Sequence, residues 1–202
     1  MIAVVVAMPL SAWAQDDWVF LADAEAGLAV DGPDMFTDRY SPVGYGAGLG
    51  IGAILSPDVM LLVYFSYTYL PIDETGFSNA EDLPGETTIS GGNLNMLYGS
   101  VGARYNLMDD PPLNTRPYLV AGVGWFYAES EDVTVENTIL GELFAPGGRE
   151  NALGVNVGIG VDFPISPTLN GFVEIQYQVG FVSEGAVSII PVRLGLAFLL
   201  GQ

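Results

Sequence analysis

The chain has 202 residues, enough for one large domain or one closed barrel. It carries 24 acidic residues against five arginines, a net charge of −19, which excludes nucleic acid as an expected partner. Half of the residues are apolar and 11% are aromatic, too many for a disordered chain. Histidine, cysteine and lysine are absent from the sequence, which excludes imidazole bases, thiolate nucleophiles, Schiff-base lysines and ordinary zinc sites. The composition predicts a folded protein without a cofactor and without most familiar catalytic groups.

The N-terminus has the pattern of an export signal. Residues 2–10 form an apolar run, and Ala12 and Ala14 fit the small-residue pattern of a signal-peptidase site. We therefore expect a signal peptide over residues 1–14 and a single domain over residues 15–202. Because no basic residue precedes the apolar run, we expect this signal to be truncated at its N-terminal end. The alternative, a short buried helix, is disfavoured because two aspartates end the run abruptly.

The rest of the chain repeats segments of about ten residues in which apolar and polar or small residues alternate. Clusters of Gly, Pro, Asp and Ser separate these segments, and this combination is typical of β-strands. The alternation is nearly complete over residues 42–55, where glycines occupy one of the two faces. The predicted strands are residues 17–30, 43–55, 59–70, 93–106, 117–129, 151–163, 169–181 and 187–199. Eight strands suffice to close a small barrel.

The connections between these segments alternate between short and long. The short ones are residues 56–58, 107–116 and 164–168, and the long ones are residues 31–42, 70–92, 130–150 and 182–186. Short turns at one end and longer loops at the other are typical of transmembrane barrels, with periplasmic turns and extracellular loops. A soluble, lipocalin-like ligand-binding barrel is the competing interpretation.

The composition of the two strand faces decides between these barrels. One face is almost wholly apolar, whereas the other is rich in glycine and holds a few polar and charged residues. A solvent face is rarely rich in glycine, but small and polar side chains fit inside a narrow lumen. We therefore expect the apolar face to contact lipid, in an all-β fold: an eight-stranded antiparallel up-and-down transmembrane β-barrel.

Aromatic residues on the apolar face gather near the ends of the predicted strands. Trp18, Tyr105, Phe163 and Phe198 fall near one rim, and Tyr45, Tyr67, Tyr69, Trp125, Tyr127 and Tyr177 fall toward the other. Membrane barrels carry such aromatic girdles at both lipid–water interfaces. These ten residues are the predicted lipid-interface aromatics.

Six charged residues are expected inside the lumen: Asp23, Glu25, Arg104, Asp162, Glu174 and Arg193. Isolated charges in a narrow lumen are costly, so they should be paired. Barrel closure makes the last two strands and the first consecutive, which should place Arg193 between Glu174 and the pair formed by Asp23 and Glu25. Arg104 and Asp162 should meet near one rim, across the inward-facing Tyr118. The network is expected to plug the lumen; an ion pathway is the alternative.

Three segments carry a resemblance to a known family: Trp18–Ala22, Pro117–Trp125 and Ile190–Phe198. With them the chain resembles the small outer-membrane β-barrel superfamily that includes the OmpA-type and opacity-type porin families. The resemblance implies an architecture, not an activity. It implies the outer membrane of a Gram-negative bacterium, with outer-membrane lipid and lipopolysaccharide around the barrel. The last segment resembles the signal by which the outer-membrane barrel assembly machinery recognises its clients.

The resemblance also bears on catalysis. Enzymes of this architecture, namely lipid A acylases and deacylases, phospholipases and omptin-type proteases, depend on a histidine, which this chain lacks. We therefore expect no enzymatic activity, with a paired-carboxylate hydrolase as a remote alternative.

The long connections hold most of the acidic residues and only two arginines, Arg39 and Arg149. Such loops can bind divalent cations that bridge to lipopolysaccharide phosphates, or a basic partner. A solvated, repulsive surface is the simpler interpretation. The sequence as a whole predicts a non-enzymatic outer-membrane barrel with a structural or surface-interaction role. A narrow porin for small solutes or ions is the alternative, and a soluble ligand-binding barrel is a remote one.

Overall fold

A computed structural model describes residues 18–31, 40–80, 87–108, 115–139, 141–182 and 185–200 of the chain. The predicted signal peptide, residues 1–14, lies outside the described residues. Most of the described residues belong to β-strands.

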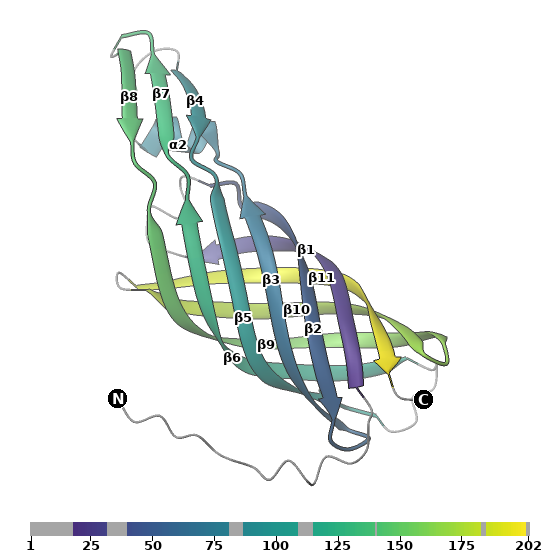
Figure 1. The fold of residues 1–202 in the computed structure, drawn as a ribbon. Helices are drawn as coiled ribbons and strands as arrows, with labels where there is room; N and C mark the ends of the chain where they lie inside the picture. The colour runs from purple at the N-terminus through teal and green to yellow at the C-terminus, as the bar shows by residue number, and fades with distance from the viewer. Residues whose placement is uncertain are drawn as a thin grey trace, which may run out of the picture.

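The described residues form a closed antiparallel barrel of eight strands (Figure 1). The strands are β1 (Trp18–Asp31), β2 (Val43–Ile54), β3 (Val59–Leu70), β5 (Leu94–Asn106), β6 (Arg116–Ser130), β9 (Arg149–Ser166), β10 (Leu169–Val182) and β11 (Gly185–Leu200). Their order around the barrel is β1-β11-β10-β9-β6-β5-β3-β2, and the pairing of β1 with both β2 and β11 closes it. The predicted fold class is confirmed. The predicted strands also coincide with the observed ones, apart from a longer β9 and small shifts elsewhere.

Alternation along each strand separates the lumen from the outer surface. In β3, Leu62 and Tyr64 are buried in the lumen, whereas Val63 and Phe65 are exposed on the outside. Leu62 is opposite Gly52 in the β2–β3 ladder, and all the lumen-facing positions of β2 from 44 to 52 are glycines. The barrel interior therefore accommodates large side chains of β3 where β2 has none.

Gly48 shows why a side chain is not tolerated on this face of β2. A Cβ atom at position 48 would collide with the phenol of Tyr64 and lie 3.0 Å from a carboxylate oxygen of Asp23. The Tyr64 hydroxyl occupies this space because it donates a hydrogen bond to Asp23. The glycine thus makes room for a polar contact between β1 and β3.

We expect Gly48→Ala to destabilise the barrel by about 1–3 kcal/mol, because overpacking an interior forces side chains out of their preferred positions. Urea unfolding of the protein in lipid vesicles measures the change. The same substitution in a Tyr64→Phe background should cost less, since the phenol oxygen nearest the new methyl group is then absent. Equal costs in the two backgrounds would contradict the assigned contact.

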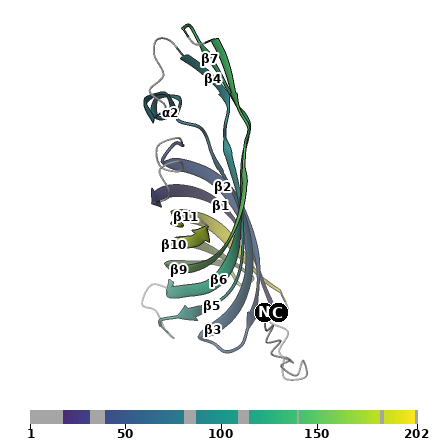
Figure 2. The same ribbon diagram turned by 90° about the vertical axis from the view of Figure 1, so that its left-hand side faces the viewer.

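The two ends of the barrel differ in structure. Residues 55–58 and 167–168 make short connections at one end, where β5 also ends and β6 begins; we call it the turn end. The opposite end, called the loop end, carries the helix α2 (Glu74–Ala80) and the short strands β4 (Thr87–Gly91), β7 (Val133–Asn137) and β8 (Gly141–Ala145). The three short strands form a sheet of order β4-β7-β8 that projects beyond the barrel (Figures 1 and 2).

This projecting sheet corrects the sequence analysis, which treated residues 70–92 and 130–150 as connections only. Strands of five residues are too short to give a clear alternation, and β4 pairs with β7 from a different connection. Phe77, Ile89 and Val135 form a small apolar cluster that holds α2 against the sheet. Gly91 and Gly92 adopt φ angles of 77° and 76°, a left-handed conformation that favours glycine, where the chain passes from β4 to β5. Among the described residues, no helix has the length and apolar character needed to cross a membrane.

The wall of the barrel is interrupted at Pro191 in β11. In the β10–β11 ladder, Ile175 pairs with Val192 and Gln178 pairs with Ile189, but no pairing is found at the two positions between them. Proline has no backbone N–H to donate to the neighbouring strand. On the outer surface the Tyr177 hydroxyl donates a hydrogen bond of 3.0 Å to Ser188 Oγ, which links β10 and β11 by side chains beside this gap.

Candidate functional site in the lumen and at the loop end

Arg193 occupies the middle of the lumen between two carboxylates. Its backbone is opposite Glu25 in the β1–β11 ladder and opposite Glu174 in the β10–β11 ladder. Its Nε donates to Glu25 Oε2 at 3.0 Å and one terminal nitrogen donates to Glu174 Oε1 at 3.1 Å. The side chains of Arg193 and Glu25 are each 1% exposed, so both are buried away from bulk solvent. The structure therefore brings these three predicted site residues together.

Asp23 has a different partner from the one that the sequence predicts. Its two carboxylate oxygens accept the Tyr64 hydroxyl, each at 2.9 Å, instead of forming an ion pair with Arg193. The Tyr64 ring lies beside the arginine, with 4.2 Å between the guanidinium carbon and the ring centroid. A cation over an aromatic face is a favourable arrangement. Tyr64 thus connects Asp23 to the cluster, a correction to the predicted pairing.

Side-chain amides extend the cluster across the barrel. The Tyr98 hydroxyl donates to Asn156 Oδ1 at 2.8 Å, and Asn156 Nδ2 donates to Gln176 Oε1 at 3.2 Å. Gln176 Nε2 in turn donates to Glu174 Oε1 at 2.8 Å. Arg193 joins Glu174 to Glu25, and Glu25 in turn accepts a hydrogen bond from the Thr68 hydroxyl. We call this set the lumen network; it consists of Tyr98, Asn156, Gln176, Glu174, Arg193, Glu25 and Thr68.

The lumen network runs from β5 through β9, β10, β11 and β1 to β3, which is most of the circumference of the barrel. Sequence reasoning named its charged members but missed the uncharged ones as partners. The inward-facing, period-two positions of Thr68, Tyr98 and Gln176 were the available signal. Buried polar groups require partners, so the uncharged residues at the height of Arg193 were candidates to supply them.

The second predicted pair, Arg104 and Asp162, lies nearer the turn end. The two side chains form a buried ion pair, and the Arg104 guanidinium carbon lies 3.4 Å from the centroid of the Tyr118 ring. Arg104 is on β5, Tyr118 on β6 and Asp162 on β9, so the pair bridges the intervening strand over its inward aromatic ring. The sequence analysis expects the same arrangement.

Apolar side chains fill the lumen on both sides of the lumen network. The cluster on the turn side consists of Val19, Leu21, Met60, Leu62, Tyr64, Phe172 and Ala197. The cluster on the loop side consists of Leu70, Leu94, Met96, Tyr98, Phe126, Ala152 and Ile189. Each cluster joins opposite walls: Phe172 is on β10 and Leu62 on β3, four places apart in the ring of eight strands. Side chains from opposite walls therefore meet above and below the ionic centre.

The ten predicted interface aromatics lie on the outer surface of the barrel, exposed or half-buried. Several of them contact another aromatic ring near the barrel ends. Ring centroids are 6.4 Å apart for Phe20 and Phe198 at the turn end, and 5.3 Å apart for Tyr45 and Tyr69 at the loop end. Between the two ends the outer surface is covered by exposed aliphatic residues such as Val157.

A family model for the outer membrane protein β-barrel domain matches residues 1–198. The chain belongs to this family. Membership places the protein in the bacterial outer membrane, where its exposed apolar surface contacts lipid instead of water.

Solved structures of outer-membrane barrels share the fold. Neisserial surface protein A matches with a TM-score of 0.57 at 16% identity, over 90% of this chain and 96% of that one. OprG from Pseudomonas aeruginosa matches with a TM-score of 0.56 at 10% identity, over 92% of this chain and 96% of that one. Ail, the attachment invasion locus protein of Yersinia pestis, matches with a TM-score of 0.54 at 13% identity, over 91% of this chain and 98% of that one. At these identities the likeness extends to the fold alone. No curated protein sequence matches the chain.

The loop end of this outer-membrane barrel is acidic. Its described acidic side chains are Asp73, Glu74, Glu129, Glu131, Asp132, Glu136, Glu142 and Glu150, against the single described cation Arg149. Arg149 forms an exposed ion pair with Glu129, with 2.7 Å between a terminal nitrogen and the carboxylate. The Tyr127 hydroxyl also donates a hydrogen bond of 3.0 Å to Glu129 Oε2. In the described part of the chain, no group of three or more acidic side chains is arranged to hold a metal ion. Cation binding by these loops stays a prediction.

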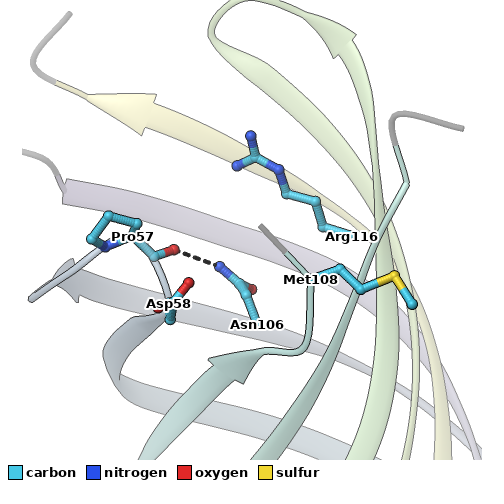
Figure 3. A pocket seen from close by; sticks show the side chains of 5 residues that line it. All are labelled: Pro57, Asp58, Asn106, Met108 and Arg116. Atoms are coloured by element: carbon cyan, nitrogen blue, oxygen red, sulfur yellow. Dashed lines mark hydrogen bonds between the residues drawn. The ribbon is translucent and has the colours of Figure 1, made fainter. Parts of the chain in front are cut away.

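The turn end of the barrel carries an open pocket that the sequence analysis did not single out (Figure 3). It has a volume of about 290 Å³ and is lined by Pro57, Asp58, Asn106, Met108 and Arg116. Asn106 Nδ2 donates a hydrogen bond of 3.0 Å to the Pro57 carbonyl, which ties the β5 end to the β2–β3 turn. The contact holds two neighbouring turns together, and the pocket follows from their geometry.

Proposed function

We propose that this outer-membrane protein is a non-enzymatic barrel with a closed lumen and a structural or surface-interaction role. The observation that carries the proposal is the filling of the lumen, by a buried ionic centre between two apolar clusters. Buried charges this well enclosed leave little space for a continuous water path, so we expect the lumen to act as a plug. If the lumen conducts no solute, the parts of the protein that can interact with other molecules outside the lipid are the two ends of the barrel.

The loop end is the end that we assign to the cell surface. In outer-membrane barrels the short turns face the periplasm and the long connections face outward. The projecting sheet and α2 then extend from the cell, with their acidic side chains in solvent. Two of the structural relatives are named as a surface protein and an attachment invasion locus protein, which favours a surface role here as well.

The negative charge of the loop end determines which partners it attracts. A strongly negative surface attracts basic partners and divalent cations and repels other anions. Divalent cations between these carboxylates and lipopolysaccharide phosphates would anchor the loops to the surrounding lipid. We also propose that the outer-membrane barrel assembly machinery inserts the chain, after export directed by residues 1–14.

Planar-bilayer conductance of the purified protein tests the plug. We expect no discrete conductance steps from the wild type, whereas the fourfold variant Phe126→Ala, Phe172→Ala, Glu174→Ala, Gln176→Ala should conduct, because it shortens side chains in both apolar clusters and in the polar layer between them. The matched control Glu136→Ala, Glu142→Ala removes two polar side chains from the projecting sheet and should stay silent. Stable steps from the wild type would contradict the plug and favour the alternative function, a narrow porin.

A further inference from the structure

A cavity of about 350 Å³ lies at the loop end, between the mouth of the barrel and the projecting sheet. Its lining comes from both parts: Leu94, Ala128 and Val187 belong to the barrel, and Phe77 and Val133 belong to α2 and β7. Figure 2 shows these elements one above the other, with α2 and β7 beyond the barrel strands. The cavity therefore exists only because the two connections fold into a sheet.

We propose that this cavity binds a small amphiphilic cation, with the apolar body of the ligand inside the cavity and its ammonium group at the rim. The site is separate from the lumen network, and it does not depend on a protein partner at the cell surface.

The apolar part of the proposal rests on the lining. Phe77, Leu94 and Val187 are each less than 9% exposed, so the inner wall of this open cavity consists of buried apolar side chains. Binding sites for small molecules are typically hollows of about 300–1,000 Å³ with a mostly apolar lining and a few polar groups. A volume at the small end of this range fits a compact ligand and excludes a peptide or a lipid with two chains.

The floor of the cavity consists of apolar side chains that separate it from the lumen network. Leu94 belongs both to the lining and to the loop-side cluster of the lumen, where it packs with the fully buried Leu70. Tyr40 and Ala128, also in the lining, are half-buried against the same cluster. A ligand that enters from outside therefore stops on apolar side chains above the lumen network, which favours binding over passage.

The charge of the rim selects a cation. Among the described residues, three charged ones line the cavity: Glu131, Arg149 and Glu150. Arg149 is committed to Glu129, which lies outside the lining, by its Nε at 2.8 Å and a terminal nitrogen at 2.7 Å. Glu131 is held in place because it accepts the Asn93 amide at 2.8 Å. With the arginine neutralised, the two lining glutamates leave the rim negative, so an ammonium group is attracted and a carboxylate or phosphate is repelled.

Calorimetric titration of the protein in phospholipid nanodiscs tests the proposal. The probes are 3-phenylpropylamine and its anionic counterpart 3-phenylpropionate, which share size and apolar body; protein-free nanodiscs supply the background. We expect saturable binding of the amine and much weaker binding of the acid. Glu131→Gln together with Glu150→Gln should weaken amine binding by about two- to fivefold per charge, the range of exposed ion pairs. Glu142→Gln on β8, an exposed acid outside the lining, should leave it unchanged.

Two substitutions test the location. Ala128→Phe should fill the cavity from the barrel side and abolish binding. Ala145→Trp should do the same from the β8 side. Because Ala145 is exposed, this second variant should fold even if Ala128→Phe does not. Equal binding of the amine and the acid would overturn the cation selectivity. Unchanged amine binding in a folded Ala128→Phe or Ala145→Trp variant would overturn the site itself.

Discussion

Replacing Arg193 with methionine should destabilise the folded barrel by about 3–5 kcal/mol, the usual cost of removing one partner from a buried ion pair. The variant keeps most of the side-chain bulk but leaves Glu25 and Glu174 without their cation in a buried site. It also removes the charge that lies against the Tyr64 ring. Urea unfolding in lipid vesicles, followed by heat-modifiable gel mobility, measures the loss.

Neutralising the stranded carboxylates separates this effect from lost packing. The triple variant Arg193→Met, Glu25→Gln, Glu174→Gln should recover part of the stability, because the two carboxylates that pair with Arg193 are then neutral and only Asp23 remains charged nearby. Arg149→Met, which breaks an exposed ion pair at the loop end, serves as the control and should unfold like the wild type. If Arg193→Met also unfolds like the wild type, the arginine is hydrated and the lumen is an open water path.

An arginine at Val157 should destabilise the barrel by about 2–4 kcal/mol in a bilayer, the cost of a cation near the membrane midplane. Val157 lies in the middle of β9, faces outward and is 56% exposed. In the outer membrane this surface faces hydrocarbon, which cannot solvate the charge. Unfolding in vesicles again gives the free-energy change.

Leu153 offers a matched position on the same face of the same strand, nearer the loop end, and is 73% exposed. There the arginine should cost only about 0–1 kcal/mol, because the side chain reaches the lipid–water interface. Equal costs at the two positions would show that depth in the membrane does not set the penalty, and the assigned lipid-facing surface would be wrong.

The alternation of residues along the strands was enough to predict which residues enter the lumen. It also placed Arg193 between Glu25 and Glu174, because β10, β11 and β1 are neighbours in the closed barrel and the three residues lie at similar heights. The face on which a residue lies is a local property of its strand, and in an up-and-down barrel consecutive strands are neighbours, so both can be predicted from a single sequence.

The partner of Asp23 could not be predicted in the same way. Tyr64 reaches it from β3, across β2, through the space that Gly48 leaves open. That contact depends on how far β3 is staggered against β1, which strand tilt and shear determine and alternation does not. The projecting sheet was missed for a related reason: β4 and β7 pair over a long separation in sequence, and neither strand is long enough to show a period.

The gap at Pro191 determines where the barrel wall can most easily part. Strands separate most readily where successive backbone bonds are missing, and the β10–β11 seam lacks two consecutive pairings. The β1–β11 seam, by contrast, is paired without a break from Trp18 to Ala29, although it joins the two ends of the chain. Transient breathing of the wall is therefore favoured within the C-terminal hairpin, while the junction that closes the ring stays shut.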